Sequence, residues 1–245
     1  MGLHHRRVDV KGRARGLGRP DVGHVVVLLG EEGEVVHVER ELGRGVAGVA
    51  PARVVIIGGG VAGTHAVEMA HGLRADVTVI DRSLPRLRAL DVQFHGVVQT
   101  LYSTADTIEK AVIDADLVIG AVLVPGAAAP KLVTEAMIKR MRPGSVVVDI
   151  AIDQGGCFAT SRPTTHADPV YVLHGVTHYC VTNMPGAVAR SSAQALTNAT
   201  LPYVKALADK GWQQALADDV GLAAGLNVLE GKVVHAAVAR DLGLT

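Results

Sequence analysis

The stretch Arg53-Val-Val-Ile-Ile-Gly-Gly-Gly-Val-Ala-Gly-Thr64 places a β-branched strand directly before a glycine motif. The motif has the spacing Gly58-x-Gly60-x-x-Gly63, and the residues from Val61 to Leu73 have a helical pattern. About twenty residues after the motif, a second apolar strand, Asp76–Ile80, ends on the acidic Asp81. Strand, glycine turn, helix and acid in this order are typical of a dinucleotide-binding site.

Each residue of the motif has a physical task in such a site. Gly58 allows the tight turn out of the strand, and Gly60 lets the backbone approach a pyrophosphate at the helix N-terminus. Gly63 lets the helix pack close to the sheet. Asp81 accepts hydrogen bonds from a ribose and repels a 2′-phosphate, which favours NAD over NADP, although the adjacent Arg82 weakens that preference. A glycine triplet by itself also occurs in ordinary strand-to-helix turns.

The composition limits the classes of protein that the sequence can belong to. A chain of 245 residues holds one large domain, or one domain and part of another. The formal net charge of zero argues against a nucleic-acid partner. The two cysteines, Cys157 and Cys180, are too few for a disulfide framework, and no metal-ligand spacing occurs. Cys157 has no histidine at an activating position, so we interpret it as a small buried residue. Without a long apolar run or a signal region, we expect a soluble cytoplasmic protein.

The chain from residue 51 onward alternates between strand-like and helical segments. This alternation predicts an α/β fold with a Rossmann-type, doubly wound parallel sheet, followed by a C-terminal helical tail. The expected strands are Arg53–Ile57, Asp76–Ile80, Gly96–Leu101, Leu117–Val122, Ser145–Ile150 and His178–Val181, and the expected helices are Val61–Leu73, Leu84–Phe94, Thr104–Ile113, Pro130–Met141, Ser191–Lys210 and Val228–Leu242.

Three regions follow from this pattern. Residues 1–50 are expected to be irregular, with a possible hairpin between His24–Leu29 and Glu34–Val38. Residues 51–186 form the expected dinucleotide-binding domain. Residues 187–245 are expected to be helical throughout.

Unusual residues follow several of the expected strands, at the sheet edge where parallel α/β proteins bind ligands. Asp149 and Asp153 both lie in an apolar run, where an unpaired carboxylate is costly. Asp149 falls within the strand and favours a structural role, whereas Asp153 precedes a Gly-Gly loop and favours a functional one. Asn183 and Met184 follow the sixth strand and can contact a ligand, or can belong only to a turn. The loop Gly120–Gly126 is likewise either a wall for a flat ring or a simple Pro-Gly turn.

With these strand ends included, the sequence resembles the alanine dehydrogenase family from about Gly45 to the C-terminus. The run Val148-Asp-Ile-Ala-Ile-Asp-Gln-Gly-Gly-Cys157 is highly specific for that family. The other segments that carry the resemblance are Ile57–Gly63, Ala115–Ala127, Ala129–Leu132, Ser161–Thr165, Tyr179–Cys180, Asn183–Pro185 and Ala195–Tyr203.

The resemblance implies NAD-dependent oxidative deamination of L-alanine to pyruvate and ammonia, in a cytoplasmic homohexamer. It implies Asp153 as the catalytic acid/base or water-orienting group, and Asn183 and Met184 as the substrate pocket. Asp81 would hold the adenosine ribose beside Arg86. The cofactor-binding residues that it implies are Gly58, Gly60, Val61, Ala62, Gly63, Asp81, Arg86, Ser103, Val122, Leu123, Ile150, Asp153, Asn183 and Met184.

One departure from the family pattern is large. The family places a substrate domain, with a lysine, an arginine and a histidine for the substrate, before the dinucleotide domain. Residues 1–44 do not resemble that domain, and Lys11 matches nothing in it. We therefore expect residues 187–245 to be a remnant of the substrate domain, and we expect impaired activity in this chain. The alternatives are the NAD-binding part of a proton-translocating transhydrogenase, a lysine-forming saccharopine dehydrogenase, or a catalytically silent nucleotide-binding module.

Overall fold

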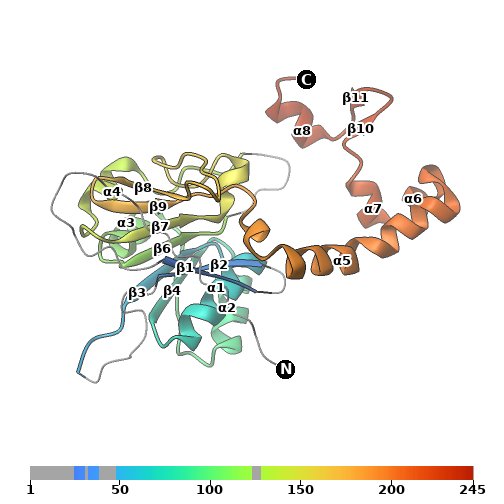
Figure 1. Ribbon diagram of the computed structural model, residues 1–245. Coiled ribbons are helices and arrows are strands. Elements are labelled where there is room, and N and C mark those ends of the chain that lie inside the picture. Colours follow the sequence, from blue (N-terminus) through green and yellow to red (C-terminus); the bar gives the residue numbers. More distant parts are fainter. Residues whose placement is uncertain (1–24, 31–32, 39–47, 123–127, 245) are drawn as a thin grey trace. The chain divides into compact units, whose positions relative to one another are not determined.

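The computed structural model describes residues 25–30, 33–38, 48–122 and 128–244. The chain divides into two compact units, with the main boundary after residue 187. The first unit is built around a seven-stranded sheet, shown in Figure 1, whose order is β5-β4-β3-β6-β7-β9-β8. Its elements are β3 (Arg53–Ile57), α1 (Val61–Gly72), β4 (Asp76–Asp81), α2 (Leu84–Gln93), β5 (Gln99–Tyr102), α3 (Ala105–Ile113), β6 (Leu117–Gly120), α4 (Glu135–Arg140), β7 (Val146–Asp149), the 3₁₀ helix η1 (Ile150–Gln154), β8 (Val170–Leu173), β9 (Val176–Tyr179) and the 3₁₀ helix η2 (Met184–Val188).

Six strands of this sheet are parallel, which confirms the expected Rossmann-type fold. The seventh, β8, was not predicted, and it pairs antiparallel with β9 at the edge of the sheet. The two strands are joined by His174 and Gly175, whose φ angles are 55° and 78°. Two successive residues with positive φ are typical of a two-residue hairpin turn, so the edge strand follows from local turn geometry.

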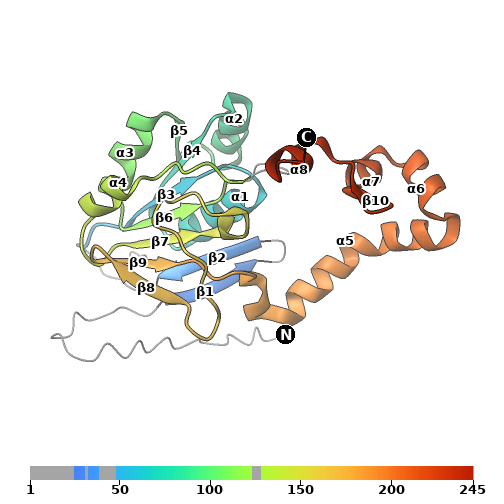
Figure 2. The ribbon, with the colours of Figure 1, turned by 90° about the horizontal axis from the view of Figure 1, so that it is seen from above.

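Alternate residues of each strand serve two separate core layers. Val54 and Ile56 of β3 pack in a cluster with residues of α1 and α2. Val55 and Ile57 pack in a second cluster with residues of α3 and α4. Figure 2 shows α3 and α4 on one side of the central strands and α1 on the other. Burial on both faces explains why these strands are continuous runs of Val, Ile and Leu rather than alternating ones.

The helix α4 begins later than the sequence predicted. The Thr134 hydroxyl caps it by accepting the Met137 N–H at 3.3 Å, so the helix starts at Glu135 instead of Pro130. The preceding residues are extended and pair with the loop after η1. The Ala129 N–H donates to the Gln154 carbonyl, and Val133 forms a bridge with Phe158. This pairing replaces the first turn and a half of the expected helix.

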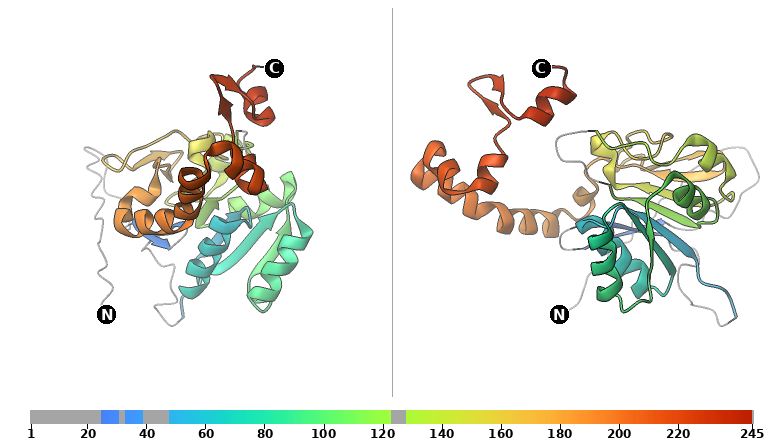
Figure 3. Two further views of the ribbon diagram at one scale, coloured as in Figure 1. Left: turned by 90° about the vertical axis from the view of Figure 1, so that its right-hand side faces the viewer. Right: turned by 180° about the vertical axis from the view of Figure 1, so that it is seen from behind.

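The second unit appears in orange and red in Figure 3. The prediction of an all-helical tail is wrong at residues 228–233, where the structure has a small antiparallel hairpin. Glu230 and Gly231, with φ angles of 51° and 77°, form its turn. The unit consists of α5 (Ala189–Lys210), α6 (Trp212–Asp218), α7 (Val220–Ala224), β10 (Val228–Leu229), β11 (Lys232–Val233) and α8 (Ala236–Asp241).

An N-terminal hairpin precedes the sheet. Strands β1 (Val25–Gly30) and β2 (Gly33–Val38) pair antiparallel from Val25↔Val38 to Gly30↔Gly33. The hairpin expected in this region is therefore present, with its first strand shifted by one residue. The expected irregular segment, residues 1–23, lies outside the described residues. Within the part of the chain that the structure describes, no helix is long and apolar enough to cross a membrane.

Candidate dinucleotide-binding site

The strand order of the sheet reverses between β3 and β6. The chain runs from β3 outward through β4 to β5, then crosses to β6 on the other side of β3 and continues outward. A crevice forms beyond the carboxyl ends of the strands at such a reversal, and α/β proteins bind dinucleotides there. The glycine motif follows β3 directly at this place (Figure 1).

Two of the three motif glycines cannot be replaced without a clash, because a side chain there would collide with the backbone. Gly58 has φ +104°, and a Cβ atom there would lie 2.5 Å from the carbonyl oxygen of Ala121, which follows β6. A Cβ atom on Gly63 would lie 1.8 Å from the carbonyl oxygen of Gly58. Gly60 differs, because a Cβ atom there meets nothing within 4 Å. The open space in front of Gly60 is the place where a pyrophosphate approaches the backbone in this motif.

The N-terminus of α1 faces the same space. Gly60 is the N-cap residue and has no side chain to cap the helix. Val61 is exposed and Ala62 is half-buried, so this first turn is accessible. Free backbone N–H groups at a helix N-terminus, together with the helix dipole, attract anions such as phosphate.

Asp81, the last residue of β4, is hydrogen-bonded to the glycine loop. One carboxylate oxygen accepts the Gly59 N–H at 2.6 Å, and the other accepts the Ser83 N–H at 2.7 Å. The guanidinium of Arg86 donates to the Gly59 carbonyl and to the Thr64 hydroxyl. Asp81 and Arg86 therefore hold the loop from one side, and the half-buried Asp81 keeps oxygen lone pairs for a ligand hydroxyl.

The remaining predicted cofactor residues lie at neighbouring strand ends. Ser103 follows β5, and its N–H donates to the Asp81 carbonyl at 2.9 Å. Val122 follows β6 and packs partly buried against the core layer on the α3 side. Leu123 and the rest of the loop up to Gly126 lie outside the described residues. Ile150 begins η1 directly after β7.

The two aspartates of the apolar run have different environments. Asp153 is exposed, in the 3₁₀ helix η1 at the carboxyl end of β7. Asp149 is fully buried, with 0% exposure, and accepts hydrogen bonds from the Cys157 N–H at 2.9 Å and from the Ser161 hydroxyl. A buried carboxylate is stable only with such donors. The structure thus places Asp149 inside the protein and Asp153 where a ligand can reach it.

Asn183 and Met184 adjoin each other but face different surroundings. Asn183 is exposed, with φ +54°, and its carbonyl oxygen lies 2.9 Å from Nε2 of His166. The Met184 side chain is 1% exposed and packs in the core layer that includes Val148 and Tyr179. A role for Met184 in a pocket remains a prediction.

Both cysteines are buried and unsuited to nucleophilic attack. Burial raises the pKa of both thiols, and the nearby Asp149 carboxylate raises that of Cys157 further. Raised pKa values keep the thiols protonated and unreactive. Among the described residues, no cluster of His, Cys, Asp and Glu has the arrangement of a metal site.

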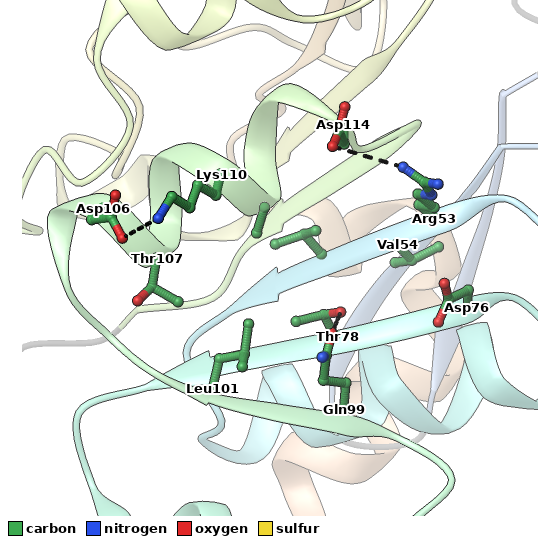
Figure 4. Close-up of a pocket in the computed structure, with 12 residues that line it drawn as sticks. Arg53, Val54, Asp76, Thr78, Gln99, Leu101, Asp106, Thr107, Lys110 and Asp114 are labelled. Atoms are coloured by element: carbon green, nitrogen blue, oxygen red, sulfur yellow. Dashed lines mark hydrogen bonds and ion pairs between the residues drawn. The ribbon is translucent and has the colours of Figure 1, made fainter.

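A second hollow lies between α3 and the strands β3, β4 and β5 (Figure 4). Four of its charged residues form two pairs: Lys110 with Asp106 at 2.8 Å, and Arg53 with Asp114 at 3.8 Å. These side chains are more than half exposed, so such pairs contribute little. The hollow contains none of the predicted site residues, and we interpret it as a solvated surface groove.

Sequence reasoning missed the residues that hold the loop after η1. The Lys131 ammonium donates to the carbonyl oxygens of Gly155 and Phe158, the latter at 3.2 Å. Ser161 donates to Asp149, and the guanidinium carbon of Arg162 lies 4.0 Å from the centre of the Tyr171 ring. Lys131, Ser161 and Arg162 all lie in segments that carry the family resemblance, and this was the signal that could have identified them.

Comparison with known proteins agrees with this geometry. The family described as "Alanine dehydrogenase/PNT, C-terminal domain" matches residues 38–236. The alanine dehydrogenase of Halomonas elongata is 67% identical over 200 residues, which cover 82% of this chain and 54% of that protein. The alanine dehydrogenase of Mycobacterium tuberculosis is 54% identical over the same length. The chain thus spans about half the length of the curated relatives it matches.

Solved structures show the same relationship. An L-alanine dehydrogenase structure superimposes with a TM-score of 0.73 at 51% identity, over 82% of this chain and 57% of the other. The transhydrogenase from Sinorhizobium meliloti superimposes with a TM-score of 0.63 at 27% identity, over 81% and 55%. The resemblance inferred from the sequence is therefore confirmed, and the chain belongs to the alanine dehydrogenase/PNT C-terminal domain family.

Proposed function

We propose that this chain binds NAD(H) in the crevice between β3 and β6. The adenosine ribose would lie against Asp81 and the pyrophosphate against Gly60 and the first turn of α1. The nicotinamide half would then extend over the ends of β6 and β7, toward Ile150 and Asp153. The space in front of Gly60 supports this proposal most directly. Backbone atoms occupy the space beside Gly58 and Gly63, whereas the space beside Gly60 is open to a ligand.

We further propose that the protein carrying this chain oxidises L-alanine to pyruvate and ammonia. The names of its relatives support the substrate, and the exposed Asp153 supports the chemistry. The nicotinamide, when held over Ile150 and Asp153, would supply the hydride acceptor for the substrate Cα. The amino group loses a proton as the imine forms, and water then adds to the imine carbon to release ammonia. Asp153 would take up that proton or orient the water, and Asn183 would contribute its amide at the same edge.

The same proposal includes a cytoplasmic location and an oligomeric assembly. The relatives are named as dehydrogenases of alanine, a small amino acid, which fits a cytoplasmic enzyme. We propose a homo-oligomer, as a homohexamer in the family pattern.

Two measurements test the proposal in sequence. Fluorescence titration with NADH and NADPH comes first, and NADH is expected to bind more tightly because Asp81 disfavours a 2′-phosphate. Alanine-dependent formation of NADH, and the reverse amination of pyruvate, come second. Binding of neither cofactor would contradict the site. Binding without turnover in a full-length protein that carries this chain would support the catalytically silent module over the enzyme, whereas little turnover is expected of this chain alone.

The transhydrogenase similarity favours one alternative function. A module of that kind exchanges hydride between nicotinamide cofactors rather than with an amino acid. Reduction of an NADP analogue by NADH, with no dependence on alanine, would favour this alternative.

A further inference from the structure

The buried carboxylate of Asp149 receives donors from a single loop. It accepts the Cys157 N–H at 2.9 and 3.2 Å through its two oxygens, and the Phe158 N–H at 3.4 Å. It also accepts the Ser161 hydroxyl. All of these donors lie in residues 157–161, which follow η1. Asp149 thus ties the end of β7 to a loop whose first donor, Cys157, lies eight residues later in the chain.

The chain has to turn back on itself for this contact to form. Gly155 and Gly156 have φ angles of 87° and 75°, a backbone conformation that favours glycine. A Cβ atom on Gly156 would lie 2.4 Å from a carboxylate oxygen of Asp149. The carboxylate therefore occupies the space that a side chain at residue 156 would fill.

Lys131 holds the same loop from the outside. Its ammonium donates to the Gly155 and Phe158 carbonyls, so the loop's N–H groups meet an anion and its carbonyls meet a cation. Backbone hydrogen bonds from Ala129 to Gln154, and from Leu132 to Cys157, both 2.8 Å, join this segment to the loop. The 3₁₀ helix η1 lies between the two fixed points, at Asp149 and at Gly155.

We infer that Asp149 is a positioning residue that fixes η1, with Ile150 and Asp153, against the nicotinamide half of the cofactor. The inference rests on the proposed function, since that function places the nicotinamide over η1. A short 3₁₀ helix has poor hydrogen-bond geometry, and η1 has no side-chain cap, so its placement depends on external contacts. Removing the charge of Asp149 leaves these N–H groups facing an amide that cannot accept from all of them.

The test compares two ligands that differ in the nicotinamide ring. NADH contains it and ADP-ribose does not, whereas both occupy the glycine loop and Asp81. In the Asp149→Asn variant, we expect the NADH dissociation constant to rise about tenfold, the size expected for one poorly paired buried group. The dissociation constant for ADP-ribose should stay within about twofold. Calorimetry well below the unfolding temperature measures both on the 245-residue chain.

Two further variants keep the test decisive. Ser161→Ala removes one hydrogen bond to Asp149 and should weaken NADH binding by a smaller factor than Asp149→Asn. If Asp149→Asn does not fold, the Ser161→Ala variant tests the positioning role in its place. Asp91→Asn, on the exposed surface of α2, is the matched control and should change neither ligand.

The possible outcomes separate the inference from the function on which it rests. Equal weakening of both ligands, or no change in either, would overturn the positioning role and leave the NAD(H) site intact. Equal binding of NADH and ADP-ribose to the unsubstituted chain would overturn it also, because the nicotinamide would then contribute nothing near η1. No binding of either ligand to that chain would overturn the proposed function itself.

Discussion

The Gly60→Val substitution should abolish most NADH binding without unfolding the protein. Gly60 has an ordinary φ of −66°, and a Cβ atom there meets nothing within 4 Å, so the folded chain offers no obstacle to a Cβ atom at this position. The loss of stability should be at most about 1 kcal/mol, the cost of an unfavourable N-cap residue. The added methyl groups project into the space in front of α1, where they displace the pyrophosphate from the helix N–H groups.

The expected loss of affinity follows from the hydrogen bonds that are displaced. One hydrogen bond to a charged phosphate contributes about 1.5–3 kcal/mol, which corresponds to a rise of about ten- to hundredfold in the dissociation constant. Fluorescence titration with NADH measures this change, and thermal unfolding checks that the variant is folded.

Two other glycines of the same helix serve as controls. Gly72, at the C-terminal end of α1, also has nothing within 4 Å of a Cβ atom, so Gly72→Val should leave NADH binding unchanged. Gly63→Ala should instead destabilise the fold, because its Cβ atom would lie 1.8 Å from the Gly58 oxygen, and overpacking of this kind costs about 1–3 kcal/mol or more. A folded Gly60→Val variant with unchanged NADH affinity would refute the assignment of the pyrophosphate to this loop.

Three further substitutions test the other parts of the site and the core. Asp81→Asn should lower the preference for NADH over NADPH, because an amide accepts one hydrogen bond from Gly59 but no longer repels a 2′-phosphate; an unchanged ratio of the two dissociation constants would argue against the ribose contact. In an active form of the protein, Asp153→Asn should reduce kcat about a hundredfold or more while NADH affinity stays similar, and near-normal kcat would leave Asp153 without a catalytic role. Burial lowers the pKa of His178 below its usual 6.5, so the unfolded chain binds the proton more readily and stability should decrease as the pH falls below about 6.5. Urea unfolding between pH 7.5 and 5 should show this slope, and a His178→Gln variant should show less of it.

The sequence by itself determined the elements that depend on local pattern. The glycine spacing from Gly58 to Gly63, and the alternation of apolar strands with helices, predicted the Rossmann-type parallel sheet that the structure has. Strand β3 was predicted to the residue, because β-branched residues before a glycine turn have few alternatives. The positions relative to the strand end favoured a structural Asp149 and a functional Asp153; the first is buried and the second is exposed, and the catalytic role of Asp153 stays a prediction.

Contacts between segments that are distant in the chain determined the remaining features of the site. The periodicity of the sequence carries no information on which segments meet. Residues 129–133 have a helical pattern but pair with the loop after η1, and Lys131 acquires its role only through that pairing. The sequence favoured a structural Asp149, but only the folded chain brings the N–H groups of Cys157 and Phe158 to its carboxylate. The same holds for Asp81, whose hydrogen bond to Gly59 depends on the parallel register that aligns Ile57 with Ile80. Local propensity thus specified the strands and glycine turn, whereas the geometry of the site arises from tertiary hydrogen bonds between residues that are far apart in the chain.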